Sequence, residues 1–83
     1  MTAIDYLNAY GIINKSGDLF YKELSNGYYL VVFQSCNDID LFLCKWLPEE
    51  RDQITSDCYI DKILSFDNNY KDKVDKFKTM LSF

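Results

Sequence analysis

Asp38 and Asp40 form the one local pair of carboxylates in this sequence whose spacing suits a divalent cation. Magnesium and calcium ions need several oxygen ligands held in a fixed geometry. A calcium loop of the EF-hand kind would run for about twelve residues with a glycine at its sixth position, whereas this stretch continues into apolar residues. We therefore predict no metal site here and interpret the pair as a turn aspartate followed by an aspartate at the edge of a strand.

Side chains for nucleophilic or acid–base catalysis are scarce. The chain contains no histidine, on which most such sites depend. Its cysteines, Cys36, Cys44 and Cys58, form no C-x-x-C pair, and its glycines are too scattered for a phosphate-binding loop. We therefore predict a protein that is not an enzyme, binds no cofactor and keeps its cysteines as free thiols. Cys36, beside a predicted turn, is the one candidate for a reactive thiol.

Acidic side chains outnumber basic ones, thirteen to nine, so the net charge is -4. A small, acidic, aromatic-rich domain suits docking on a basic groove, where carboxylates replace phosphates and accelerate association. The predicted partner is a larger protein with a basic surface. The alternative is that the carboxylates only keep the protein soluble. The predicted partner-binding residues are Asp38, Asp40, Glu49, Glu50, Asp52, Asp57 and Asp61.

Positions 70–83 reverse this charge balance, with four lysines and two aspartates. Such lysines could contact a nucleic-acid backbone while Tyr28, Tyr29 and Trp46 stack on bases. The simpler interpretation is a solvated helix side and aromatic residues that belong to the core of a sheet. The net negative charge also argues against direct nucleic-acid binding. The lysines concerned are Lys71, Lys73, Lys76 and Lys78.

A short N-terminal helix is the first element that the sequence predicts. Thr2 can cap this helix, and Asp5 stands three residues later, where the second side chain of a capping box belongs. Gly11 suits a position just after the helix. Because about two turns of helix are not stable alone, the apolar side must dock on the rest of the protein.

A β-hairpin is predicted next. Aromatic and β-branched residues dominate 19–24 and 28–34, on either side of Asn26-Gly27. Asn-Gly accepts the two positive φ angles of a type I′ turn, which favours a two-residue loop. The pairs across this loop would be Leu24 with Tyr29, Lys22 with Val31 and Phe20 with Phe33.

A second turn, at Asn37-Asp38, would lead into a third strand over 39–47. Both faces of this meander carry apolar side chains, whereas a sheet open to solvent on one side alternates apolar and polar residues. We therefore expect the second face to be covered, either by helices divided between the faces or by a partner such as a second copy. One face would hold Phe20, Leu24, Tyr29, Val31, Phe33, Phe42, Cys44 and Trp46, with Phe33 opposite Phe42 and Tyr29 opposite Trp46; the other would hold Leu19, Tyr21, Tyr28, Leu30, Val32, Leu41, Leu43 and Leu47.

Helical segments are predicted after the sheet. Pro48 ends the third strand and can begin a brief helical turn. A helix capped by Ser56 or Asp57 would follow, and apolar residues at helical spacing within 70–81 predict a final amphipathic helix. The predicted fold is α+β, a single domain over 1–83. It has a three-stranded antiparallel meander, a short N-terminal helix and two C-terminal helices, in the order α-β-β-β-α-α.

Compartment and origin follow from composition. No basic segment followed by an apolar run opens the chain, and its longest apolar run is far shorter than the roughly 20 residues that span a bilayer. We expect a cytoplasmic protein with no membrane contact. Residues with AT-rich codons greatly outnumber those with GC-rich codons, which points to a low-GC bacterium or one of its viruses; if a phage encodes the chain, the compartment is the host cell.

The function expected from these features is that of a small inhibitor or adaptor that docks on a larger protein, for example a nucleic-acid-binding one. Phage-encoded antagonists of bacterial defence systems share this profile of small size, acidity and absent catalytic groups. The alternatives are a toxin immunity protein, a dimeric nucleic-acid-binding regulator that uses the C-terminal lysines, and a structural part of a larger assembly.

Overall fold

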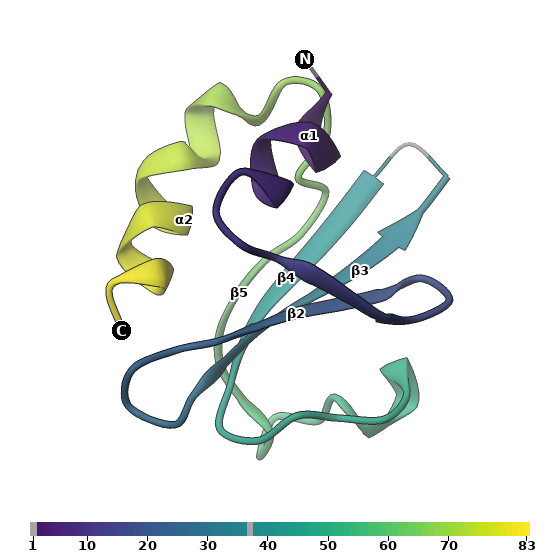
Figure 1. Cartoon of the computed structure of the whole chain (residues 1–83), viewed down its shortest axis with the longest axis vertical. Helices are drawn as coiled ribbons and strands as arrows, with labels where there is room; N and C mark the ends of the chain where they lie inside the picture. The colour runs from purple at the N-terminus through teal and green to yellow at the C-terminus, as the bar shows by residue number, and fades with distance from the viewer. Residues whose placement is uncertain (1, 37) are drawn as a thin grey trace.

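The computed structural model describes residues 2–36 and 38–83. It contains one five-stranded antiparallel sheet in which every strand pairs with the next along the chain (Figure 1). A short helix precedes the sheet and a longer one follows it (Figure 1). The α-helices and strands are α1 Ala3–Asn8, β1 Ile13–Ser16, β2 Leu19–Glu23, β3 Tyr29–Ser35, β4 Asp38–Cys44, β5 Tyr59–Ile63 and α2 Val74–Leu81, with 3-10 turns η1 Arg51–Gln53 and η2 Tyr70–Lys73.

The predicted three-stranded meander with two C-terminal helices is wrong, because two more strands flank it. β5 forms where a helix was expected, in a short apolar segment whose spacing fits a strand as well as a helix. β1 has little apolar alternation, since its side chains are mostly exposed, and its pairing with β2 holds it in the sheet. The observed order is therefore one helix, five strands and one helix.

Both terminal helices are confirmed. The Thr2 hydroxyl accepts the Asp5 amide at 3.3 Å, and the Asp5 carboxylate accepts the Thr2 amide at 3.2 Å, which completes the capping box. The final helix begins as η2 and continues as α2, burying Phe77 and Met80. The brief helical turn expected after Pro48 is η1.

The first hairpin is shifted by one residue from the predicted register. Leu19 pairs with Phe33 because the loop has three residues, 25–27, in place of two. Gly27 alone among them has a positive φ, of 78°, which is typical of a type I turn followed by a left-handed glycine. A shift of one residue moves every side chain of a strand to the other face. Phe20 consequently lies on the face opposite to the one predicted.

The second hairpin keeps the predicted faces but moves by two residues. Val31 pairs with Phe42 and Tyr29 with Cys44. β4 ends at Cys44, so the expected contact between Tyr29 and Trp46 does not form. Asp38, predicted to lie in the turn, is the first residue of β4, while its predicted turn neighbour Asn37 lies outside the described residues.

Both faces of the sheet are covered from within the chain. One face, which includes Leu30 and Leu41, packs against Leu7 of α1 and Phe77 of α2. The two helices lie side by side on this face (Figure 1). The opposite face packs against apolar residues of the segment 45–58. The helices are therefore not divided between the faces. The centre of each face is buried by the chain itself, while Ile13 of β1, at the edge of the second face, is 54% exposed.

Candidate protein-interaction surface

The connection between β4 and β5 covers residues 45–58 and is hereafter the 45–58 loop. Its two ends meet, since the Lys45 amide donates to the Cys58 carbonyl oxygen at 2.7 Å. Inside the loop, the Glu49 amide donates to the Gln53 side-chain oxygen at 2.7 Å, and η1 forms one helical turn. Compact surface loops with adjacent ends frequently carry function when a rigid scaffold positions them.

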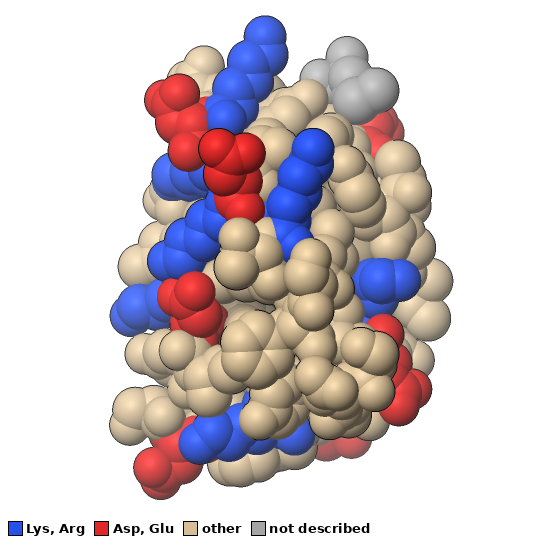
Figure 2. All heavy atoms as spheres, turned by 90° about the vertical axis from the view of Figure 1, so that its left-hand side faces the viewer, with Lys and Arg blue, Asp and Glu red and all other residues tan. Residues whose placement is uncertain are grey.

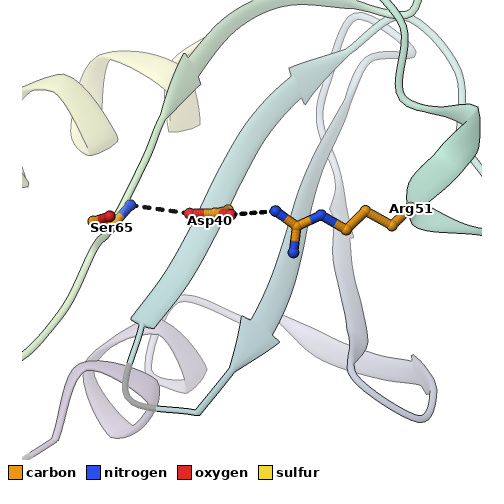
Figure 3. Close-up of polar contacts among 3 residues, drawn as sticks. All are labelled: Asp40, Arg51 and Ser65. Carbon is orange, nitrogen blue, oxygen red and sulfur yellow. Dashed lines mark hydrogen bonds and ion pairs between the residues drawn. The ribbon is translucent and has the colours of Figure 1, made fainter.

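An ion pair fastens the loop to the sheet. The Arg51 guanidinium donates to Asp40 at 2.7 Å, and the other oxygen of Asp40 accepts the Ser65 amide at 3.0 Å (Figure 3). The guanidinium also stands 6.0 Å from the centre of the Phe33 ring. Ser65 has a φ of 59°, a left-handed conformation that few non-glycine residues adopt. Asp40 therefore fastens two segments to β4, one on each side: the 45–58 loop through Arg51 and the segment after β5 through Ser65.

Two further contacts restrain the same loop. Glu49 forms an ion pair with Lys15 of β1 at 3.0 Å. Pro48 is fully buried, and the neighbouring Leu47 and Ile54 pack on the sheet. The loop is thus held at its base, at η1 and along its apolar side, and side chains on its outer surface project from a fixed backbone.

The predicted acidic residues do not form one surface. Glu49 and the exposed Glu50, Asp52 and Asp57 belong to the 45–58 loop. Asp40 is 9% exposed and occupied by Arg51, so it supports the loop and is not open to a partner. The other two residues lie outside the loop. Asp38 is exposed at the start of β4, at the opposite end of the sheet from η1 (Figure 1). Asp61 in β5 forms an ion pair with Lys76 at 3.0 Å.

Trp46 is exposed at the base of the loop and is not part of the sheet core as predicted. Its side chain is 47% exposed, and its carbonyl oxygen lies 3.8 Å from the Cys58 sulfur. Tryptophan is among the residue types most enriched where protein interfaces are energetically strongest. An exposed tryptophan therefore shares the loop with three exposed carboxylates, Glu50, Asp52 and Asp57, which have no ion pair within 2–36 and 38–83.

Sequence reasoning missed both Trp46 and Arg51 as parts of this site. A signal for Arg51 was present, because a carboxylate inside an otherwise apolar strand needs a cation. Asp40 is such a carboxylate, and the chain holds a single arginine. No comparable signal identified Trp46, since an apolar residue at the end of a strand is equally typical of a core.

Two of the four C-terminal lysines contact the backbone. The Lys73 ammonium donates to the carbonyl oxygens of Leu64 at 2.6 Å and Ser65 at 2.9 Å. The Lys76 ammonium donates to the Lys62 carbonyl oxygen at 2.7 Å. Lys71 and Lys78 are exposed. Figure 2 shows lysines interspersed with acidic side chains on the α2 side of the molecule, so the lysines form no continuous basic surface there.

The predicted stacking residues of the sheet are partly covered. Tyr28 lies against Phe83, with ring centres 5.2 Å apart, and Tyr29 lies 6.4 Å from Tyr21. Both tyrosines are half-buried. Neither presents a free aromatic face comparable to that of Trp46.

The three cysteines are free thiols in different surroundings. Cys36 is exposed beside a cleft of about 190 Å³ between the start of α1 and the β3–β4 turn. Cys44 and Cys58 are fully buried, and burial together with the adjacent Cys58 thiol raises the pKa of Cys44. Among the residues that the structure describes, no group of three or more cysteine and acidic side chains could hold a metal ion.

Comparison of the chain with family models, curated proteins and solved structures finds no match. Over the described part of the chain, no helix has the length and apolar character needed to cross a membrane. Any assignment of function must therefore come from the surface of the molecule itself.

Proposed function

We propose that this protein works by binding a larger protein with a basic surface through the 45–58 loop, and that it performs no catalysis. The observation that carries the proposal is the exposed Trp46 together with Glu50, Asp52 and Asp57 on a loop fastened to the sheet. An aromatic side chain supplies contact area, and carboxylates on the same loop select a basic partner and accelerate the encounter.

The restraint of the loop supports this proposal energetically. Binding costs free energy when a flexible segment must be ordered. Here Arg51 and Glu49 hold the loop by ion pairs, and its base is closed by the hydrogen bond from Lys45 to Cys58. Because folding already orders the loop, binding loses less conformational entropy and the net free energy of binding is more favourable.

The biological role that we propose is a small cytoplasmic inhibitor or adaptor. Its size, its acidity and its free thiols match the class of antagonists that phages encode against bacterial defence systems. A toxin immunity protein would have the same properties. Both roles require a partner whose functional surface the loop can occupy, so the same binding experiment addresses them.

The test uses the immobilised chain and a lysate of a low-GC bacterium, followed by purification of any protein retained in stoichiometric amount. One variant removes the loop charges by Glu50→Gln, Asp52→Asn and Asp57→Asn, and a second is Trp46→Ala. A matched control removes three carboxylates elsewhere, by Asp18→Asn, Glu23→Gln and Asp72→Asn.

The purified partner should bind the original chain and the control equally, and bind both loop variants at least about tenfold more weakly. Its association should slow as salt concentration rises, because exposed charges are screened. Equal binding by the loop variants, or the absence of a stoichiometric partner, would contradict the proposal.

The alternative of a nucleic-acid-binding regulator predicts a salt-sensitive shift of DNA in a gel. A Lys71→Gln, Lys78→Gln variant should then lose that shift. The contacts of Lys73 and Lys76 with backbone carbonyls give this alternative no support. The loop proposal expects no DNA shift from the original chain.

A further inference from the structure

Two thiols stand at the base of the 45–58 loop. Cys44 immediately precedes the loop, and Cys58 is its last residue. The backbone brings them together, because Cys44 is the strand partner of Tyr59, the residue after Cys58. The hydrogen bond from the Lys45 amide to the Cys58 carbonyl closes the same corner.

The separation of the two residues suits a disulfide. In a regular antiparallel pair, strand partners lie about 5 Å apart and neighbouring residues about 3.4 Å along the strand, so a diagonal pair such as Cys44 and Cys58 has Cα atoms about 6 Å apart. The ladder between β4 and β5 is irregular between Leu43 and Cys44, next to this pair. Disulfides join Cα atoms that are about 4.4–6.8 Å apart. Both side chains belong to the same apolar cluster, in which each is fully buried. Burial, and after it the Cys58 thiol, raises the pKa of Cys44, which agrees with this placement.

We propose that Cys44 and Cys58 form a disulfide on exposure to a low-molecular-weight disulfide, and that this bond locks the base of the 45–58 loop. The significance of the lock for binding rests on the proposed function of the loop. The formation of the bond does not, because it follows from the positions of the two residues.

The reaction is a double thiol–disulfide exchange. One cysteine thiolate attacks the oxidant's disulfide, forms a mixed disulfide and releases one thiolate of the oxidant. The second cysteine thiolate attacks the protein sulfur of that mixed disulfide and releases the other half. The two cysteines lose two electrons and two protons, and the oxidant gains two electrons and two protons to become two thiols. Because both sulfurs are buried, the exchange proceeds when the loop opens.

The experiment uses a Cys36→Ser chain, in which the exposed thiol cannot react, and oxidised glutathione as the probe. Trypsin cleaves after Lys45 and Arg51, so Cys44 and Cys58 fall in different peptides. The intact mass should fall by two hydrogens, and a non-reducing digest should contain these two peptides joined. Amide exchange within 46–57 should slow at least about tenfold, because the closed loop loses open conformations. Dithiothreitol should reverse all three changes.

A Cys36→Ser, Cys58→Ala chain should stop at the mixed disulfide and yield no joined peptides. If that variant does not fold, the peptide map of the Cys36→Ser chain decides the matter alone. Absence of the joined peptides, even in urea sufficient to open the loop, would overturn the proposed bond. A bond without slower amide exchange would overturn the proposed lock.

Failure of this inference is separable from failure of the proposed function. Binding of the basic partner by the reduced chain tests the function without any disulfide. The joined peptides test the bond without any partner. Each result stands whatever the other experiment finds.

Discussion

The three cysteines have identical side chains that lie in different surroundings. Cys36 follows β3 and is exposed, whereas Cys44 and Cys58 are enclosed by the face of the sheet that the 45–58 loop covers. Burial disfavours the thiolate, so it raises the pKa of Cys44 and lowers its reactivity. Surroundings also distinguish the aspartates, because Asp40 is enclosed by its partners and Asp52 is open to solvent.

Reaction with a thiol reagent should separate the cysteines. In the folded chain, Ellman's reagent should modify one thiol rapidly, that of Cys36, because the other two are shielded. In denaturant it should modify all three. A Cys36→Ser chain should show no rapid phase. If two or three thiols of the original chain react rapidly, the burial of Cys44 and Cys58 is contradicted.

Tyr6 should make folding sensitive to alkaline pH. Its hydroxyl lies 3.3 Å from that of Tyr10, and this hydrogen bond, with burial, raises the pKa of Tyr6 to about 12. An unfolded tyrosine has a pKa of about 10. The folded state therefore favours the neutral phenol, and the resulting stabilisation is complete below about pH 10 and is lost as pH rises towards 12.

The measurement is urea unfolding at several pH values between about 9 and 12, compared with Tyr6→Phe. Because phenylalanine does not ionise, the variant should lose stability less steeply over this interval. An ultraviolet titration of the folded variant should also lack one late-ionising tyrosine. Equal slopes for the two proteins would show that Tyr6 titrates normally.

Individual elements depend on contacts from distant parts of the chain. η1 is a single 3-10 turn with no side-chain cap, and it is positioned by the bond between Arg51 and Asp40. In the sheet that residues 2–36 and 38–83 form, β5 is an edge strand and pairs with β4. Lys73 and Lys76 reach carbonyl oxygens along β5 and just beyond its end. These lysines shield a strand edge that would otherwise offer pairing sites to another chain.

Loss of Arg51 should loosen the 45–58 loop. Arg51→Ala leaves the Asp40 carboxylate enclosed without its cation, which should lower the free energy of unfolding by about 1–3 kcal/mol. The lower part of this interval applies because the Arg51 side chain is half exposed. Urea unfolding measures the loss. The double variant Asp40→Asn, Arg51→Ala should lose less free energy of unfolding than Arg51→Ala, because no buried charge is left unpaired. A larger loss in the double variant would contradict the role given to the ion pair.

Removal of the shielding lysines should expose β5. In a Lys73→Met, Lys76→Met chain, three backbone carbonyls lose their donors, so the melting temperature should fall and light scattering on heating should rise. The net stabilisation per hydrogen bond is about 0.5–1.5 kcal/mol. The matched control is Lys71→Met, Lys78→Met, which removes two exposed lysines of the same segment. Equal scattering by the two variants would show that the edge needs no shielding.

The molecule as a whole is a sheet covered on both faces by its own chain. Leu30 and Val31 are adjacent in β3 and fully buried on opposite faces. The helices cover the first face and the 45–58 loop covers the second. The sequence left open a homodimer formed through an apolar sheet face. The centre of each face is covered within the described residues, whereas Ile13 at the β1 edge is 54% exposed.

A charge at the centre of the sheet should unfold the molecule. Leu30→Asp buries an unpaired carboxylate, at a cost of several kcal/mol that is comparable with the roughly 5–15 kcal/mol stability of a whole domain. Circular dichroism should show loss of the fold. Ile60→Asp is the control, because Ile60 is 41% exposed. Sedimentation of the original chain should give one 9.8 kDa species at all concentrations; a folded Leu30→Asp protein would contradict the assigned register.

Local features of the sequence were sufficient to predict the parts of the fold that depend on neighbouring residues. The capping box of Thr2 and Asp5 and the helical spacing of 70–81 involve residues within a few positions of one another. The apolar character of both sheet faces also follows from strand periodicity alone. The absence of histidine is likewise a property of composition.

The remaining features depend on contacts between residues far apart in the chain. Segment 59–63 suits a helix or a strand by itself, and its pairing with β4 makes it a strand. The first hairpin loop accepts two or three residues, and packing on both faces of the sheet selects the three-residue form with Gly27 left-handed. The bond between Arg51 and Asp40 joins residues eleven positions apart, and it is this tertiary contact that turns an irregular acidic segment into a positioned surface with Trp46 exposed.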